Sequence, residues 1–318
     1  MNYGTKVVMA ETDCDTIKMV GLSSWLSSVG RKTLQPDVSS SRKISGLIAM
    51  MRLPNCLMIG FAVIVGEFIS SLVVPVRAAF YGFIAGFLLL AASMILNDYF
   101  DREIDAINEP GRPLPAGIVT APEALSFALI LGSLGLYSAA STGFATLVVA
   151  ILSLIIMASY NARIKKTGLL GNVLVSTNVA IPLIYGGFAV ARPTWTLAIF
   201  ALIAFISSVG REIVKGIADV PGDTSRGVKS VAATKGASVA AKYGGALFLC
   251  AVALSPLPLL LGLVTYLYIP LVVICDIGFL LTTYSILSNP TPRSAKRNKR
   301  YVLLWMTFGL LAFLMGTF

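Results

Sequence analysis

The chain of 318 residues contains no histidine, few charged residues and four cysteines. Without histidine, haem ligation by imidazole, histidine-based metal sites and the commonest general base are all excluded. Cysteines 14, 56, 250 and 275 form no CxxC pair, so we infer neither a disulfide framework nor a zinc site. Any chemistry must therefore use carboxylates, Lys, Arg, Tyr, the backbone or a bound metal ion.

Charge is also scarce, because 13% of the residues are charged and 56% are hydrophobic. The apolar residues form repeated runs long enough to cross a bilayer core of ~30 Å. These runs predict an all-α integral membrane protein, with nine transmembrane helices in a bundle around a central cavity that opens at the cytoplasmic side. The predicted spans are 53–74, 79–97, 120–138, 143–161, 169–190, 195–212, 242–262, 264–287 and 301–318.

The basic residues provide an independent prediction of topology, because cytoplasmic loops are enriched in Lys and Arg. With the N-terminus inside and nine spans, 23 of the 25 basic residues fall in cytoplasmic segments. Only Arg77 and Arg192 fall outside. We therefore expect a cell-membrane protein with its N-terminus and active site at the cytoplasmic side. Orientation and contact with lipid headgroups explain the net charge of +10 without a nucleic acid.

Residues 1–45 differ in composition from the rest of the chain. They are polar, and they lack the basic start and long apolar core of a cleaved signal. We predict a flexible, polar cytoplasmic extension over 1–45, followed by a membrane domain over 46–318.

The first acidic segment, "NDYFDREIDAINEPGRPLPAG" (97–117), directly follows an uncharged apolar run. On a helix, Asp98, Asp101 and Asp105 would share one face with Asn97. Carboxylates so close repel one another, and this repulsion is poorly screened near a membrane. Salt bridges to Arg102 or Arg112 would relieve part of it. A divalent cation would relieve the rest of the repulsion. Because the available ligands are oxygen atoms and histidine is absent, we expect this cation to be Mg²⁺.

The second acidic segment, "REIVKGIADVPGDTSRGVKSVAATKG" (211–236), follows the sixth span on the same predicted side. Asp219 and Asp223 are separated by Pro221 and Gly222, so we expect a helix end or a turn there. Basic residues surround this pair, namely Arg211, Lys215, Lys229 and Lys235.

We expect the bundle to bring the two acidic segments together. Two Mg²⁺ ions between them, with Arg and Lys nearby, would bind a diphosphate. A hydrocarbon attached to that diphosphate would lie in the bilayer, which explains why the acids occur at the membrane boundary.

These segments resemble motifs of a known family. "NDYFDREID" is similar to the NDxxDxxxD motif, and "DVPGD" to the second DxxxD motif, of the UbiA-type intramembrane prenyltransferases. "GRPLPAG" is typical of them, and "YNARIKKTG" resembles their Tyr/Lys element. The resemblance extends from about Arg52 to the C-terminus. Within the family, "REIVKGIADVPGD" and "RLPNCLMIG" look most like the archaeal branch of digeranylgeranylglyceryl phosphate synthases.

The resemblance implies Mg²⁺-dependent transfer of a geranylgeranyl group from its diphosphate to the free hydroxyl of geranylgeranylglyceryl phosphate, in archaeal ether-lipid synthesis. The implied partners are a prenyl diphosphate donor, a phosphorylated glycerol-ether lipid acceptor and membrane lipids. Implied metal ligands are Asn97, Asp101, Asp105, Asp219 and Asp223, while Asp98 either ligates or orients its neighbours. Implied catalytic residues are Asp101, Asp105, Asp219, Asp223, Lys165 and Tyr160. Implied substrate-binding residues are Arg52, Asn97, Arg102, Tyr160, Lys165, Arg211, Lys215 and Lys229.

Two alternative functions remain open. Prenyl transfer to an aromatic acceptor is the main alternative within the family, and a secondary transporter is the alternative outside it. A transporter would place charges near the membrane midplane, whereas these acids gather at one face.

Two acids lie well inside the predicted spans. Asp276 is expected to be a structural acid or a cavity residue. Glu67 is expected to reach the outer interface.

Overall fold

The computed structural model describes residues 39–162, 164–225 and 227–318, and Lys43–Phe318 forms one compact unit. The predicted extension 1–45 lies outside the described residues as far as residue 38, so its flexibility stays a prediction. Within the described part, every regular element is a helix.

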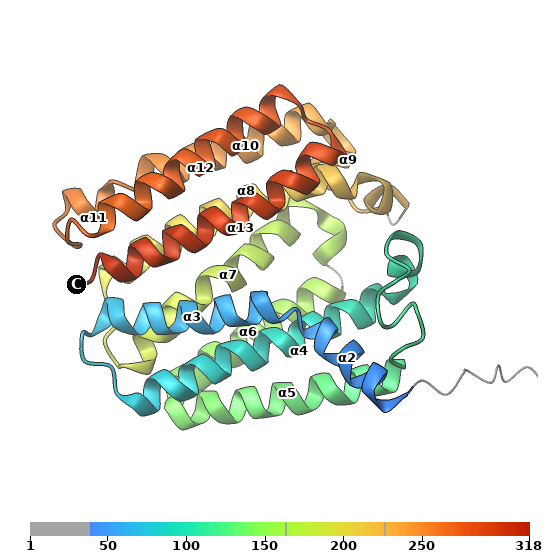
Figure 1. The fold of residues 1–318 in the computed structure, drawn as a ribbon, viewed down its shortest axis with the longest axis horizontal. Helices are drawn as coiled ribbons and strands as arrows, with labels where there is room; N and C mark the ends of the chain where they lie inside the picture. The colour runs from blue at the N-terminus through green and yellow to red at the C-terminus, as the bar shows by residue number, and fades with distance from the viewer. Residues whose placement is uncertain (1–38, 163, 226) are drawn as a thin grey trace, which may run out of the picture. The chain divides into compact units, whose positions relative to one another are not determined.

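Most helices follow one another with short connections, and a long loop joins α4 to α5 (Figure 1). In chain order they are α2 (Ser40–Met51), α3 (Leu53–Ser70), α4 (Val76–Asn108), α5 (Ala121–Thr142), α6 (Phe144–Ala162), the 3₁₀ turn η1 (Ile164–Thr167), α7 (Leu169–Ala189), α8 (Trp195–Ser225), α9 (Val231–Lys235), α10 (Ala237–Leu254), α11 (Leu257–Leu260), α12 (Tyr268–Ser288) and α13 (Pro292–Met315).

Eight of the described helical segments are long and apolar enough to cross a membrane. They correspond to the first eight predicted spans, with the seventh formed by α10 and α11 together. The ninth predicted span, 301–318, falls in α13, whose first turns hold five basic residues. The apolar part of this helix is therefore shorter than ~20 residues, the usual length of a span. That α13 crosses the membrane stays a prediction.

The two helices that carry the acidic segments are the longest described, with 33 residues in α4 and 31 in α8. A helix of about 20 residues already crosses the ~30 Å apolar core. Both helices therefore extend beyond it by two or more turns. Figure 1 shows α2, α9 and the segment after α4 at one end of the bundle, and α11 at the other.

Helix α3 lies at the centre of the bundle and contacts α4, α7, α8 and α13. Its contact with α7 is very close, because a Cβ on Gly66 would lie 2.2 Å from the Leu183 carbonyl oxygen. A Cβ on Gly186 would likewise lie 2.3 Å from the Val63 carbonyl oxygen. Small residues at helix interfaces permit such approach in membrane proteins. The α3–α7 pair thus separates the space beside α4 and α6 from the space beside α12 and α13.

Asp219 and Asp223 lie in the last two turns of α8, so the predicted helix end is confirmed, but the helix does not break at Pro221 and continues to Ser225. Proline removes the hydrogen bond to the carbonyl four residues earlier. Here the helix ends one turn later, so little regular structure is lost. The hydroxyl of Thr224 also donates to the Val220 carbonyl at 2.9 Å.

The expectation that Glu67 reaches the interface is wrong. Its side chain is 0% exposed, and neither carboxylate oxygen has a hydrogen-bond partner among the described residues. Gly82 on α4 leaves room for it, since a Cβ there would lie 2.5 Å from Glu67 Oε1. The side chain therefore points into the α3–α4 contact.

Candidate active site

A polar cavity of about 360 Å³ lies where α4 and α8 extend from the bundle. Both acidic segments line it, so the expectation that the bundle brings them together is confirmed. We call it the polar cavity, and its lining residues are Arg52, Asn97, Asp101, Asp105, Glu109, Arg112, Tyr160, Lys165, Lys215, Ala218, Asp219, Pro221, Gly222, Asp223, Lys296 and Lys299.

The carboxylates of α4 share one buried helix face and are held by basic groups. Arg52 Nη2 donates to Asp98 Oδ1 at 2.6 Å, and Arg112 Nη1 lies 3.4 Å from the same oxygen. Arg112 Nη1 also donates to Asp105 Oδ2 at 2.5 Å. Burial lowers the pKa of Arg112, but Asp105 and Asp98 outweigh it, so this pKa is raised overall. The predicted bracing of the acids by Arg112 is therefore confirmed.

Asp101 lies on α4 and faces the turn after α6. It accepts hydrogen bonds from Lys165 Nζ and from Asn97 Nδ2, the latter at 3.1 Å. Lys165 Nζ also lies 5.9 Å from the centre of the Tyr160 ring. The "YNARIKKTG" element thus contributes a cation and an aromatic face to the first acidic segment, as the resemblance implies.

The α8 side of the cavity has a different arrangement. Lys215 Nζ donates to Glu212 at 2.9 Å, and Arg211 Nη1 donates to the same carboxylate at 2.7 Å. Glu212 is buried. It was not predicted from the sequence as a site residue, because it is a single acid between the basic residues Arg211 and Lys215. Among the described residues, no basic group lies within 4.0 Å of Asp219 or Asp223.

The donor set fits a hard cation such as Mg²⁺. Carboxylate and amide oxygens line the cavity, and among the described bases none forms a salt bridge with Asp219 or Asp223. Among the described residues, no group of three or more Asp, Glu, Cys or His side chains could hold one ion by itself. Mg²⁺ does not require such a cage, since it commonly binds one or two carboxylates, waters and substrate phosphates. The arrangement therefore suits an ion that arrives with a phosphorylated ligand.

Four predicted residues do not line the polar cavity. Asp98 lies behind it, held by Arg52 and Arg112. Arg102 Cζ lies 4.8 Å from the centre of the Tyr99 ring and pairs with Glu103 at 3.9 Å. Arg211 supports Glu212, and the backbone amide of Lys229 donates to the Lys166 carbonyl at 3.0 Å. Asp98 and Arg211 therefore act on the cavity through their neighbours.

Two lysines of α13 line the cavity although the sequence pointed only to a topological role for them. Lys296 and Lys299 belong to a run of five basic residues, which reads as an orientation signal. Burial lowers the pKa of Lys299, and Lys215, Arg211 and Lys296 lower it further, while Asp219 opposes the shift. Lys296 and Lys299 are three residues apart, and on a helix this spacing could have indicated that they share one face.

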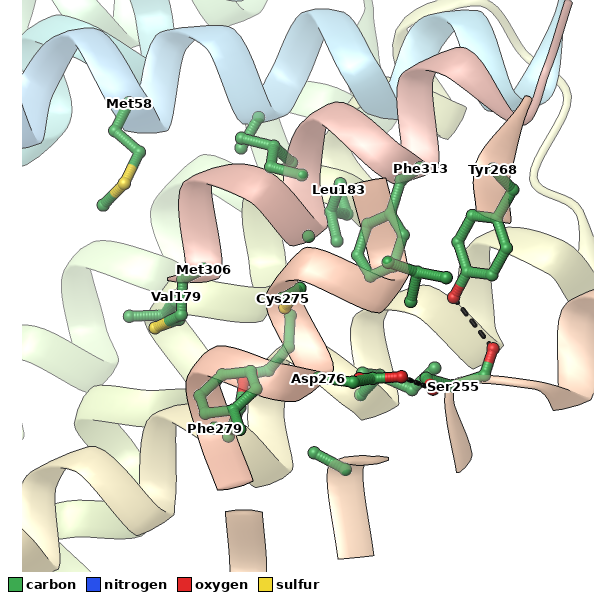
Figure 2. Close-up of a pocket in the computed structure, with 18 of the residues that line it drawn as sticks. Met58, Val179, Leu183, Ser255, Tyr268, Cys275, Asp276, Phe279, Met306 and Phe313 are labelled. Atoms are coloured by element: carbon green, nitrogen blue, oxygen red, sulfur yellow. Dashed lines mark hydrogen bonds between the residues drawn. The ribbon is translucent and has the colours of Figure 1, made fainter. Parts of the chain in front are cut away.

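Two smaller, apolar cavities lie deeper in the bundle. The first, of about 60 Å³, lies between α3, α4, α6 and α7 and includes Ser93 and Met157, one turn below Asn97 and Tyr160. The second, of about 70 Å³, lies between α3, α7, α8, α10, α12 and α13 (Figure 2). Ile59 of α3 lines both. We call them the first and second apolar cavities.

The second apolar cavity contains one acid, Asp276. It accepts a hydrogen bond from the Ser255 hydroxyl at 2.6 Å, and Tyr268 donates to the Ser255 carbonyl at 2.9 Å (Figure 2). Both parts of the expectation for Asp276 hold, since it is a cavity residue and is tied into the structure.

Spanning helices, with acids and bases around one cavity at their end, define a polytopic membrane protein with a site for anionic ligands. The model of the UbiA prenyltransferase family matches residues 57–313, and the chain belongs to this family. It is a prenyltransferase by family, which contradicts the secondary-transporter alternative.

Individual relatives agree with this assignment. A digeranylgeranylglyceryl phosphate synthase of Methanopyrus kandleri is 35% identical over 260 residues, which cover 82% of this chain and 94% of the relative. A solved structure of a digeranylgeranylglyceryl phosphate synthase is 31% identical, with a TM-score of 0.70, and the match covers 86% of this chain and 98% of that one. The structure of a UbiA homologue from Archaeoglobus fulgidus, bound to GPP and Mg²⁺, has a TM-score of 0.62 at 19% identity and covers 86% and 99%.

Proposed function

We propose that this protein transfers a geranylgeranyl group from geranylgeranyl diphosphate to the free hydroxyl of geranylgeranylglyceryl phosphate, with Mg²⁺. The observation that carries this proposal is the single cavity lined by carboxylates of both α4 and α8 together with lysines. The names of the relatives support these two substrates, and the GPP and Mg²⁺ in the Archaeoglobus structure support a prenyl diphosphate donor and this ion.

In this proposal, Asn97, Asp101 and Asp105 hold one Mg²⁺, and Asp219 and Asp223 hold a second. Bound metal would neutralise the charge that develops on the leaving diphosphate. Asp98 orients the α4 face through Arg52 and Arg112 and is not a ligand.

The basic groups of the cavity would bind the diphosphate and stabilise its negative charge as the bond between the allylic carbon and the diphosphate oxygen breaks. Lys165 is the first candidate for a direct phosphate contact, because it lies at the junction of Asp101 and Tyr160. Lys215 is the second, since it lines the cavity from α8. The Tyr160 ring would stabilise the allylic cation by ~0.5–2 kcal/mol through cation–π attraction.

The first apolar cavity would take the part of the donor hydrocarbon that is nearest the diphosphate. Ser93 and Met157 line that cavity one turn below Asn97 and Tyr160, on the same two helices. A chain bound there would hold its allylic carbon beside the acids and exclude water from the cation. The positive-inside bias places this end of the bundle at the cytoplasmic face.

The test is a transfer assay with purified protein, labelled geranylgeranyl diphosphate and Mg²⁺. Either geranylgeranylglyceryl phosphate or 4-hydroxybenzoate is supplied as acceptor. We expect label on the lipid phosphate only, and loss of product when Mg²⁺ is chelated. Label on the aromatic acid alone would replace this proposal by the aromatic-acceptor alternative, and diphosphate release by an Asp101→Ala variant at the wild-type rate would contradict the site.

A further inference from the structure

The polar cavity carries two lysines that form no salt bridge with a described acid. Lys165 pairs with Asp101, Arg112 with Asp105, and Lys215 with Glu212. Among the described residues, no carboxylate oxygen lies within 4.0 Å of the ammonium of Lys296 or of Lys299. These two cations are therefore available to an anion other than the protein's own acids.

The same face of α13 connects these lysines to an apolar space. Lys299, Met306, Leu310 and Phe313 are separated by seven, four and three residues, so they follow one stripe of the helix. The last three line the second apolar cavity. Lys299 is seven residues from Met306, about 10 Å along the axis. Helix α13 thus presents cations at one end of the stripe and a hydrocarbon surface at the other.

The two apolar cavities lie on opposite sides of the close α3–α7 contact. The first lies below the acids of α4, and the second lies along α13 and α12. The proposed reaction joins two amphiphiles, each with an anionic head and a long hydrocarbon. Two separate hydrocarbon spaces, each lined by helices that also line the polar cavity, match this requirement, whereas a donor with a small acceptor would need only one.

We propose that Lys296 and Lys299 bind the phosphate of the acceptor lipid, and that the second apolar cavity takes part of its hydrocarbon. This inference rests on the proposed function and specifies how that site recognises its second substrate. The donor diphosphate then lies toward the acids of α4 and α8, and the acceptor hydroxyl lies between the two heads.

The head-group test compares two acceptors that differ only in phosphate, geranylgeranylglyceryl phosphate and geranylgeranylglycerol. A hydrogen bond to a charged group contributes about tenfold or more in affinity, so the Lys296→Gln/Lys299→Gln double variant should lower the ratio of kcat/KM values for the two acceptors about a hundredfold. The Arg297→Gln/Arg300→Gln double variant removes the same charge from the same helix but outside the cavity lining, and it should keep the wild-type ratio. Lys299→Arg should retain most of the preference for phosphate.

A different pattern of kinetic constants would contradict this inference. If the lysine double variant keeps the wild-type ratio while the KM for geranylgeranyl diphosphate rises, the lysines serve the donor and the inference is wrong. Binding of geranylgeranylglyceryl phosphate, measured calorimetrically without donor, separates this inference from the proposed function. Weaker binding to the lysine double variant supports the lysine site even if turnover fails, and equal binding overturns it.

The hydrocarbon part is tested by a matched pair of cavity-filling variants. Ala204→Leu fills the second apolar cavity, and Ala150→Leu fills the first. We expect Ala204→Leu to raise the KM for the lipid acceptor and Ala150→Leu to raise the KM for the donor. The reverse pattern in folded, monodisperse variants would assign the cavities the other way and overturn this part of the inference.

Discussion

Glu67 is a buried acid without a hydrogen-bond partner among the described residues. The sequence placed it in the outer third of the predicted span 53–74, where a carboxylate can reach the interface. It could not reveal that Gly82 opens a space on the facing helix. A buried polar group without a partner costs about 1–3 kcal/mol of stability. The protein therefore holds an unfavourable group in its α3–α4 contact.

We predict that Glu67→Met raises the melting temperature of the detergent-solubilised protein, because it removes the unpaired buried oxygens. The matched variant is Glu123→Met. Glu123 pairs with Lys43 at 2.8 Å and forms the capping box of α5 with Thr120, so its loss should lower the melting temperature. A lower melting temperature for Glu67→Met would mean that this carboxylate has a partner or a role.

At the scale of the elements, the long helices were predictable and their polar ends were not. Apolar length alone located the beginnings of the first eight spans within a few residues. It could not extend α4 to Asn108 or α8 to Ser225, because those ends are polar in sequence and are stabilised by contacts with other segments of the chain. Arg112 is an example, since it folds back from the following loop onto Asp98 and Asp105.

The α3–α7 contact gives the second prediction. Gly186→Ala should strongly destabilise the protein, because its Cβ would meet the Val63 carbonyl at 2.3 Å and force the two helices apart. Gly132→Ala on α5 is the control, since its Cβ would lie 3.7 Å from Ala92 Cβ, an ordinary contact. Alanine is the better helix former by about 1 kcal/mol, so this variant should be neutral or stabilised. Equal melting temperatures for both variants would contradict the close contact.

At the scale of the whole molecule, the alternation of basic loops was sufficient to predict that both acidic segments lie at one end. Lys296 and Lys299 could not be assigned in the same way. In the sequence, a cation that orients a helix and a cation that binds a ligand look identical. Only the packing of α13 against α8 brings these two lysines to the cavity.

The sidedness of the bundle is tested by labelling single cysteines in a variant without the four native ones. Gly111→Cys lies in the exposed loop at the polar-cavity end, and Val73→Cys lies in the exposed loop after α3. In intact cells, a membrane-impermeant maleimide should label Val73→Cys only. Labelling of Gly111→Cys before lysis would place the cavity outside.

The central claim is that acids of α4 and α8 act together on one magnesium-bound diphosphate. Its most direct test is calorimetric binding of geranylgeranyl diphosphate, with and without Mg²⁺, to the wild type, Asp101→Asn, Asp219→Asn and the double variant. We predict that binding requires Mg²⁺, that each single substitution removes most of the Mg²⁺-dependent affinity, and that the double variant loses little more. Equal binding without Mg²⁺, or strictly additive losses from the two helices, would contradict a shared site.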